Sequence, residues 1–513
     1  MTARRSIVIL LVLHVMSCRA QELDPDTLAS AESLSWIEDL MMDALPGSSM
    51  LVRTGTGGEI TGMRLLLDHP SAHGGLLRSA TFGEHPLWWV GFRGRTWTLL
   101  VGDVTAEAGY GSLLSAARGL GRSRLLPARP LRMLASDVHA RSVRGGIGGV
   151  RGVAAAFRLD TQMVGRVMIG SSDDAQFLAA WLESRLFGAS SCLTFLVRGD
   201  TQGIAPALAV AVGKQFGGVE AGCELAVDAR LRPVLQACLA VRSTNAPTSL
   251  SLWYAPADCD LPMGSVWATS EPMNNTWGAM LRQRVSVRAV ATARLSACLY
   301  GRPWRSRLLP MASAGVEVIA DIEQRVTSRL IAEWRVRHRH DEDGRTDGLR
   351  RQLQRHLWSA RIRLRRNVTR DLDVRVNIDL RALRHGIEGW SYGTLGWVDA
   401  CWRAGTSAVL RLRATVFAAE SSDVAVAGVE YASQGLQTMV RGLGWGRRVS
   451  LGGEWTVPGM AAIALQASAE SRIYNGELRN DVRLRISAGL LGAFWGSSRG
   501  GALPTDDMRE LHE

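Results

Sequence analysis

The chain has 513 residues, 46% of them hydrophobic, and a formal net charge of +12, with a mean hydropathy of +0.02. No run approaches the roughly 18 to 20 apolar residues of a membrane-spanning helix, which excludes a helical membrane protein. A membrane barrel stays open, because only alternate residues of its strands must be apolar. The basic charge is arginine scattered along the whole chain, with Lys214 the only lysine, and this spread argues against a nucleic-acid partner.

Residues 1–20 have the pattern of an export signal: two early arginines, a short apolar run and small residues before Ala20. The apolar run is too short to span a bilayer. We expect cleavage between Ala20 and Gln21. The alternative interpretation is a lipobox, Val15-Met16-Ser17-Cys18, which would leave a lipid on the cysteine.

Residues 21–50 predict one short helical segment on the periplasmic side. Asp24 can cap it and Pro25 suits its first turn. Apolar residues then recur at helical spacing until Pro46 and Gly47 end it.

Residues 51–495 alternate between apolar and polar positions. In residues 371–381 every even position is aliphatic and every odd one is polar or charged. A strand sorts such residues onto two faces, whereas a helix would scatter them around its circumference. The pattern therefore predicts an all-β region.

Three features favour a membrane barrel over a periplasmic β-protein. The strand-like segments are about 9 to 13 residues long, enough for a tilted crossing of a bilayer. There are 17 tryptophans, many near predicted strand ends, as in aromatic girdles. An export signal comes first. We predict a transmembrane antiparallel β-barrel of roughly 20 to 24 strands in a bacterial outer membrane, followed by a polar tail at residues 496–513. The tryptophans assigned to the girdles are Trp88, Trp97, Trp253, Trp334, Trp358, Trp397 and Trp455.

Three stretches interrupt the alternation. Residues 106–147 are rich in glycine, arginine and proline, with a short helix predicted at 112–120. Residues 173–186 predict a helix, and residues 255–277 a long polar loop. In a wide barrel such segments either cover the outer mouth or fold into the lumen.

The barrel is expected to close through its last strand. The apolar phase runs through residues 481–494 and ends on the aromatic Phe494. We expect this strand to pair with a first strand near residues 59–67, because an unpaired edge in a membrane would leave backbone groups without partners.

Several separated stretches resemble one known family, the large outer-membrane barrel proteins of the Bacteroidetes–Chlorobi group catalogued as helix-hairpin-helix domain-containing proteins. The resemblance covers about residues 59–491, and it implies the outer-membrane location and barrel fold without an established substrate. The tandem helix-hairpin-helix repeats of that family are absent. The stretches are Val101-Gly102-Asp103 with Gly109-Tyr110-Gly111-Ser112-Leu113, Val150-Arg151-Gly152-Val153-Ala154, Leu252-Trp253-Tyr254, Met273-Asn274-Asn275 and Arg472-Ile473-Tyr474.

The candidate binding residues are arginines on the polar strand phase, which faces the lumen if the aliphatic phase faces lipid. One interpretation is a positive lumen that concentrates an anionic solute. The other is that these arginines pair with carboxylates such as Asp373 and Asp379 across neighbouring strands and stiffen the wall. The arginines are Arg335, Arg337, Arg361, Arg363, Arg375, Arg411, Arg413, Arg483 and Arg485.

Other motifs carry less chemistry. Residues 338–347 form a donor-rich loop that either binds calcium or is an ordinary hydrated hairpin loop, and the spacing favours the latter. Cys223 and Cys238 alternate with opposite sets of residues, which predicts opposite faces and no disulfide. His356 and His385 have no serine placed beside them, so neither an enzyme activity nor a cofactor is predicted.

The sequence therefore favours a channel, transporter or secretion-associated pore of unknown substrate. The alternative is a non-conducting structural barrel that anchors a periplasmic or surface partner. The expected partners are outer-membrane lipids and lipopolysaccharide, the barrel assembly machinery and an anionic solute.

Overall fold

Every regular element in the described part of the computed structural model is a β-strand. No helix among these residues is long and apolar enough to cross a membrane. The structure describes residues 49–54, 60–69, 72–79, 87–108, 110, 112–114, 137–140, 149–172, 175–186, 188–201, 203–261, 263, 274–287, 290–304, 311–345, 351–405, 407–431, 437–457, 461–474 and 477–491.

Most strands follow one another closely along the chain. The strands are β1 Ser49–Thr54, β2 Ile60–His69, β3 Ala72–Ser79, β4 Leu87–Arg93, β5 Trp97–Glu107, β6 Asp137–Ala140, β7 Gly149–Arg158, β8 Met163–Ser172, β9 Ala175–Leu186, β10 Ala189–Asp200, β11 Gly203–Phe216, β12 Val219–Val227, β13 Pro233–Val241, β14 Thr248–Ala255, β15 Thr276–Val287, β16 Ala291–Arg302, β17 Ser313–Thr327, β18 Leu330–Arg345, β19 Arg351–Asn367, β20 Leu372–His385, β21 Trp390–Ala404, β22 Ala408–Ala419, β23 Val426–Tyr431, β24 Gln437–Gly442, β25 Gly444–Val457, β26 Ala461–Tyr474 and β27 Glu477–Leu491.

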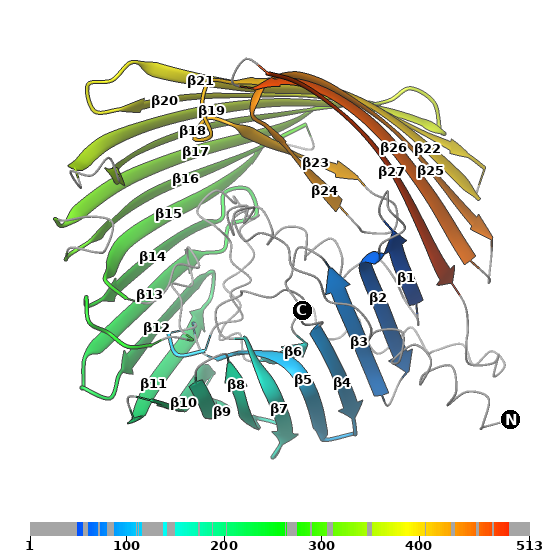
Figure 1. Cartoon of the computed structure of the whole chain (residues 1–513). Helices are drawn as coiled ribbons and strands as arrows, with labels where there is room; N and C mark the ends of the chain where they lie inside the picture. The colour runs from blue at the N-terminus through cyan, green and yellow to red at the C-terminus, as the bar shows by residue number, and fades with distance from the viewer. Residues whose placement is uncertain are drawn as a thin grey trace, which may run out of the picture.

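These strands form a closed antiparallel barrel (Figure 1). The main sheet has 25 strands. One of them, β6, pairs with β5 alone among the described residues, and the other 24 form the ring, in which each strand pairs with two neighbours. The predicted all-β barrel of roughly 20 to 24 strands is confirmed.

The ring closes between β27 and β1, where Arg53 is in register with Ser487. The predicted closing partner, residues 59–67, was wrong, because that stretch belongs to β2, which pairs with the other edge of β1. The sequence did not reveal β1 because a strand of six residues is too short to show a clear alternation, and it directly follows the predicted helix. Ser49 and Met50, placed at the end of the predicted helical segment 21–50, in fact begin β1, and residues 21–48 lie outside the described residues.

The aliphatic and polar faces of the wall are sorted as the alternation predicts. On β20, Ile378 and Leu380 are 42% and 49% exposed, whereas Asp373 and Asp379 are buried. The charged face is the inner one. The segment between β22 and β25 folds back inside the ring as the hairpin β23–β24 (Figure 1), and the inward Arg381 guanidinium of β20 donates to the Ala425 carbonyl oxygen of this segment at 3.0 Å.

The helix predicted at residues 173–186 was wrong, since this stretch is mostly strand β9. Phe177, Ala179 and Trp181 are buried on the inner face, and Leu178 is exposed on the outer face. Both faces are apolar here, so the period of two disappears from the sequence. Residues 112–114, predicted to begin a short helix, instead form a bend whose Leu114 bridges to Ala108.

The loop predicted at residues 255–277 does connect two strands, β14 and β15. It is less polar than expected in its described part, because Cys259, Leu261 and Met263 are buried in the largest hydrophobic cluster of the barrel. That cluster also contains Tyr110 from the connection between β5 and β7. The described parts of both long connections therefore fold inward.

Candidate functional site

The inner wall carries a ladder of paired charges. Arg335 on β18 lies 2.6 Å from the Asp321 carboxylate on β17, and the two residues are in direct register. Arg361 on β19 pairs with Asp379 on β20 in the same way. Opposite charges placed directly across an antiparallel pair stabilise the sheet locally.

The other predicted arginines of this wall extend the ladder. Arg337 pairs with Glu317, Arg363 lies 3.3 Å from Glu333, Arg375 lies 2.7 Å from Asp373 and Arg413 lies 2.9 Å from Asp399. Arg337, Arg363 and Arg413 pair across neighbouring strands, as one of the two interpretations of these arginines expects, whereas Arg375 pairs within its own strand β20.

The remaining predicted site residues are placed differently. Arg411 is half-buried on β22, in register with Cys401 and Gly452. Arg483 and Arg485 lie on β27, but their side chains are outside the described part of the structure. Ala20 and Gln21 also lie outside the described residues, so the cleavage site stays a prediction.

One carboxylate near the end of β18 gathers three donors. Asp341 accepts hydrogen bonds from Arg339 at 2.6 Å, Arg355 at 2.8 Å and the Tyr300 hydroxyl at 3.1 Å. The sequence had assigned this aspartate to a hydrated loop, but β18 continues to Arg345. Among the described residues, no group of histidine, cysteine and acidic side chains is arranged to hold a metal ion.

A second polar cluster joins the inner wall to the segment that follows β5, and we call it the lumenal latch. The Glu224 carboxylate on β12 accepts from the backbone N–H groups of Tyr110 at 3.1 Å and Ser112 at 3.0 Å. Gln236 on β13 donates from its amide to the Tyr110 carbonyl oxygen and the Ser112 hydroxyl oxygen, at 3.1 and 3.0 Å. All four residues are at most 4% exposed, so these bonds form away from water, where they are strongest.

The surroundings of the latch explain its fit. A Cβ atom at Gly222 would overlap the Tyr110 hydroxyl, so only glycine leaves room for this ring on the wall. Burial raises the pKa of Tyr110, which keeps the phenol neutral. Sequence analysis missed Glu224 and Gln236. Only a weak indication of them is present in the sequence, because each is one polar residue at an inward position of a strand whose other residues are mostly small or apolar.

Two stretches used for the family resemblance meet in space. Asp103 of the Gly-Asp motif is in register with Arg151 of the strand that begins Val150-Arg151-Gly152, and their charged atoms are 3.0 Å apart. The same carboxylate accepts from the backbone N–H of Trp88 at 2.9 Å. Gly102 has a φ of +116°, and a Cβ atom at this position would overlap the Trp88 carbonyl oxygen.

The tryptophans divide between the two faces. Trp97, Trp334, Trp358 and Trp455 are 43% to 46% exposed on the outer face. Trp253, in contrast, is 4% exposed and donates to Thr276 inside the barrel. Trp397 lies under Arg413, at 4.3 Å. These two therefore do not belong to an aromatic girdle.

Comparisons with known proteins add the following. No family model matches the chain, and no curated protein matches it, so the family resemblance stays a prediction. The chain is similar to the ferripyoverdine receptor of the outer membrane of Pseudomonas aeruginosa (TM-score 0.45, 9% identity, 86% of this chain and 71% of that one). It is also similar to a copper transporter (0.46, 8%, 86% and 80%) and to a porin solved with oligogalacturonate (0.19, 12%, 42% and 92%). Values this low assign no substrate or mechanism.

The arrangement of the strands and of their side chains defines the class of protein. A closed ring of strands with aliphatic side chains outside and charged side chains inside satisfies every backbone group of the wall within a bilayer. The chain is a transmembrane β-barrel of the outer-membrane type, with a polar lumen into which parts of two long connections fold.

Proposed function

We propose that this protein is an outer-membrane channel or transporter whose lumen is narrowed by the segment held at the lumenal latch. The observation that carries the proposal is the hydrogen bonding of Tyr110 and Ser112 to Glu224 and Gln236 on the inner wall. Barrels of 16 to 18 strands leave an aqueous channel, and about 22 strands enclose a plugged lumen. The lumen of a ring of this size is either open to ions or filled by polypeptide. The lumenal latch consists of four hydrogen bonds, and these can break so that the inward segment leaves the wall.

An anionic solute fits the inner wall better than a cationic one. Arg282 and Arg284 on β15 are on the inward phase together with Arg294 on β16, and Arg284 stands in register with Arg294 rather than with a carboxylate. A polar cleft of about 80 Å³ lies close by. It is lined by the arginines Arg294, Arg335, Arg361 and Arg363 and the carboxylates Asp321, Glu323 and Glu333, among others.

The second candidate is a non-conducting barrel that anchors a partner. The paired charges of the ladder favour it, because a neutralised wall attracts solutes weakly.

Planar-bilayer recordings of the full chain separate the two functions. We expect small or rare conductance from the wild type and larger, more frequent openings when Glu224→Ala and Gln236→Ala are combined. In a salt gradient the reversal potential should indicate anion preference, and Arg282→Ala with Arg284→Ala should weaken it. Absence of conductance in both proteins would favour the structural barrel, and cation preference would contradict the proposed solute class.

A further inference from the structure

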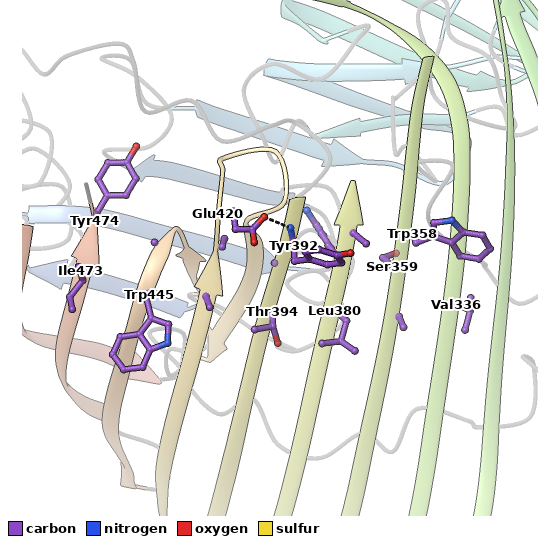
Figure 2. A pocket seen from close by; sticks show the side chains of 17 residues that line it. Val336, Trp358, Ser359, Leu380, Tyr392, Thr394, Glu420, Trp445, Ile473 and Tyr474 are labelled. Carbon is purple, nitrogen blue, oxygen red and sulfur yellow. Dashed lines mark hydrogen bonds between the residues drawn. The ribbon is translucent and has the colours of Figure 1, made fainter. Parts of the chain in front are cut away.

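A groove of about 780 Å³ runs across the outer face of the wall between β18 and β26. Figure 2 shows it from outside, with the pale blue strands of the opposite wall behind. Its floor consists of small side chains from four neighbouring strands, which are Ala360, Ala382, Thr394 and Ala418.

The groove arises from strand register. Leu380, Thr394, Ala418 and Trp445 follow one another across β20, β21, β22 and β25 as direct partners. Two small residues therefore lie between two large ones, and the surface dips. Trp358 on β19 also lines the groove, and it is 46% exposed.

The groove is lined by exposed apolar side chains, so it is suited to a hydrocarbon chain. Tyr392 and Trp445 are 55% and 64% exposed, and their rings stand beside the floor (Figure 2). Aromatic side chains of this kind settle at the boundary between hydrocarbon and headgroups. The groove thus lies at a membrane interface rather than at the midplane.

A basic cluster lies directly beyond the groove on the same outer face, and we call it the basic rim. The rings of His340 and His356 stack at 4.3 Å, and His338 stacks on Trp358 at 4.1 Å. Arg384 is exposed and in register with His356.

Two carboxylates on this side accept hydrogen bonds from neutral donors. Glu342 accepts from the Gln352 amide at 2.6 Å, and Glu420 accepts from the Tyr392 backbone N–H at 2.8 Å. The positive charge of the basic rim is that of the Arg384 guanidinium, which complements a phosphate, and the neighbouring imidazole N–H groups can donate hydrogen bonds to the same phosphate.

The strand order places groove and rim at the end of the barrel that carries the long connections, from β5 to β7 and from β14 to β15. The opposite end has tight turns, such as residues 217–218 and 328–329. Outer-membrane barrels have short periplasmic turns and longer extracellular loops. The groove consequently faces the outer leaflet.

We propose that this groove and the basic rim bind a phosphate-bearing lipid of the outer leaflet, lipopolysaccharide. An acyl chain lies over Thr394 and Ala418, and a phosphate lies against Arg384 and His356. The site is on the outer wall and does not depend on the channel function of the lumen.

Native mass spectrometry of the purified full chain tests the site with diphosphoryl lipid A as the probe. Arg384→Ala combined with His356→Ala should weaken retention about tenfold, the loss expected for one charge-assisted contact. Thr394→Trp should fill the groove and prevent retention. The matched control is Arg366→Ala, because Arg366 is exposed at the other end of β19 and should retain lipid like the wild type.

Two further arms identify the ligand chemistry. Lipid A without its phosphates should be retained poorly, and millimolar inorganic phosphate should not displace the diphosphoryl lipid. Equal retention by wild type and the Arg384→Ala, His356→Ala protein would overturn the proposal. So would equal retention of the phosphate-free lipid, displacement by phosphate alone, or a polypeptide in the groove. Heat-modifiable migration verifies assembly, and if Thr394→Trp fails to assemble, the Arg384 arm still decides.

Discussion

The Glu224 carboxylate of β12 holds the backbone N–H of Tyr110, a residue 114 positions earlier in the chain, at 3.1 Å. The same oxygen accepts from the backbone N–H of Ser112, so one wall side chain anchors two residues of the inward segment. An acceptor this deeply buried is costly to lose, because the two N–H groups cannot turn to water. Glu224 therefore supplies two of the four hydrogen bonds of the lumenal latch.

We expect Glu224→Ala to loosen the inward segment without preventing assembly of the barrel. Loss of the acceptor should cost about 1 to 3 kcal/mol of local stability. Hydrogen exchange at the Tyr110 and Ser112 amides should accelerate by about tenfold or more. Glu323→Ala is the control, since Glu323 is 46% exposed and pairs with Arg294. Unchanged exchange in Glu224→Ala would mean that hydrophobic packing alone holds the segment.

Breaking the most buried ion pair of the ladder should destabilise the barrel. Arg413 and Asp399 have side chains only 6% and 7% exposed, so Asp399→Asn leaves a buried charge at a cost of about 3 to 5 kcal/mol. Arg413→Met added to Asp399→Asn should recover much of the loss. The exposed pair Arg479 and Glu477, at 64% and 69%, provides the control, and Glu477→Gln should cost less than about 1 kcal/mol. Urea unfolding in detergent measures all three, and equal effects for the two pairs would contradict the prediction.

A charge on the outer face should disturb assembly more than loss of one from the inner face. Val376 on β20 lies between Leu364 and Val398 in the aliphatic band. Val376→Arg should cost about 2 to 4 kcal/mol near the midplane of the bilayer, whereas Arg375→Val leaves the Asp373 carboxylate near Arg365 at 3.5 Å. The fraction of heat-modifiable protein in outer-membrane preparations reports the difference. Equal assembly of the two variants would show that this band does not face lipid.

The closing register should be detectable by cross-linking. Val52 and Ala488 are direct partners across the seam between β1 and β27, and Cβ atoms of such partners lie about 4.5 to 5.5 Å apart. Val52→Cys with Ala488→Cys should form a disulfide on mild oxidation, visible as a mobility shift of the denatured chain. Val52→Cys with Ile486→Cys is two residues out of register and should cross-link far less. The opposite order of yields would place the seam in another register.

The cysteines should differ in reactivity according to their surroundings. Burial, followed by the charge of Asp228, raises the pKa of Cys259 to about 12. A thiol with a raised pKa stays protonated as the pH rises, so at pH 9 Cys259 remains mostly thiol whereas an ordinary cysteine is largely thiolate. Maleimide labelling mapped by mass spectrometry should therefore leave Cys259 unmodified from pH 7 to 9. Urea-unfolded protein should label there fully, and rapid labelling of the folded chain would contradict the burial.

Alternation along single strands was enough to predict the class of fold. In residues 371–381 the even positions proved to be the outer ones and the odd positions the inner ones, because a strand's two faces are set by neighbours in the chain. The same reasoning predicted that Cys223 and Cys238 lie on opposite faces. Cys223 is exposed and Cys238 buried, and the two are one position out of register.

Only the tertiary structure decided which residues meet. Nothing local links Glu224 to Tyr110, or Thr394 to Ala418 and Trp445, because such contacts depend on how each strand is offset from the next and on where the ring closes. The two wrong predictions, a helix in place of β9 and a closing strand at residues 59–67 in place of β1, have the same cause. At β9 an inward segment covers the lumenal face and permits apolar residues on both sides, and at β1 the closing of the ring gives six residues a partner that their own pattern does not reveal. Local periodicity is a property of one strand, whereas the latch, the groove and the seam are properties of the closed barrel.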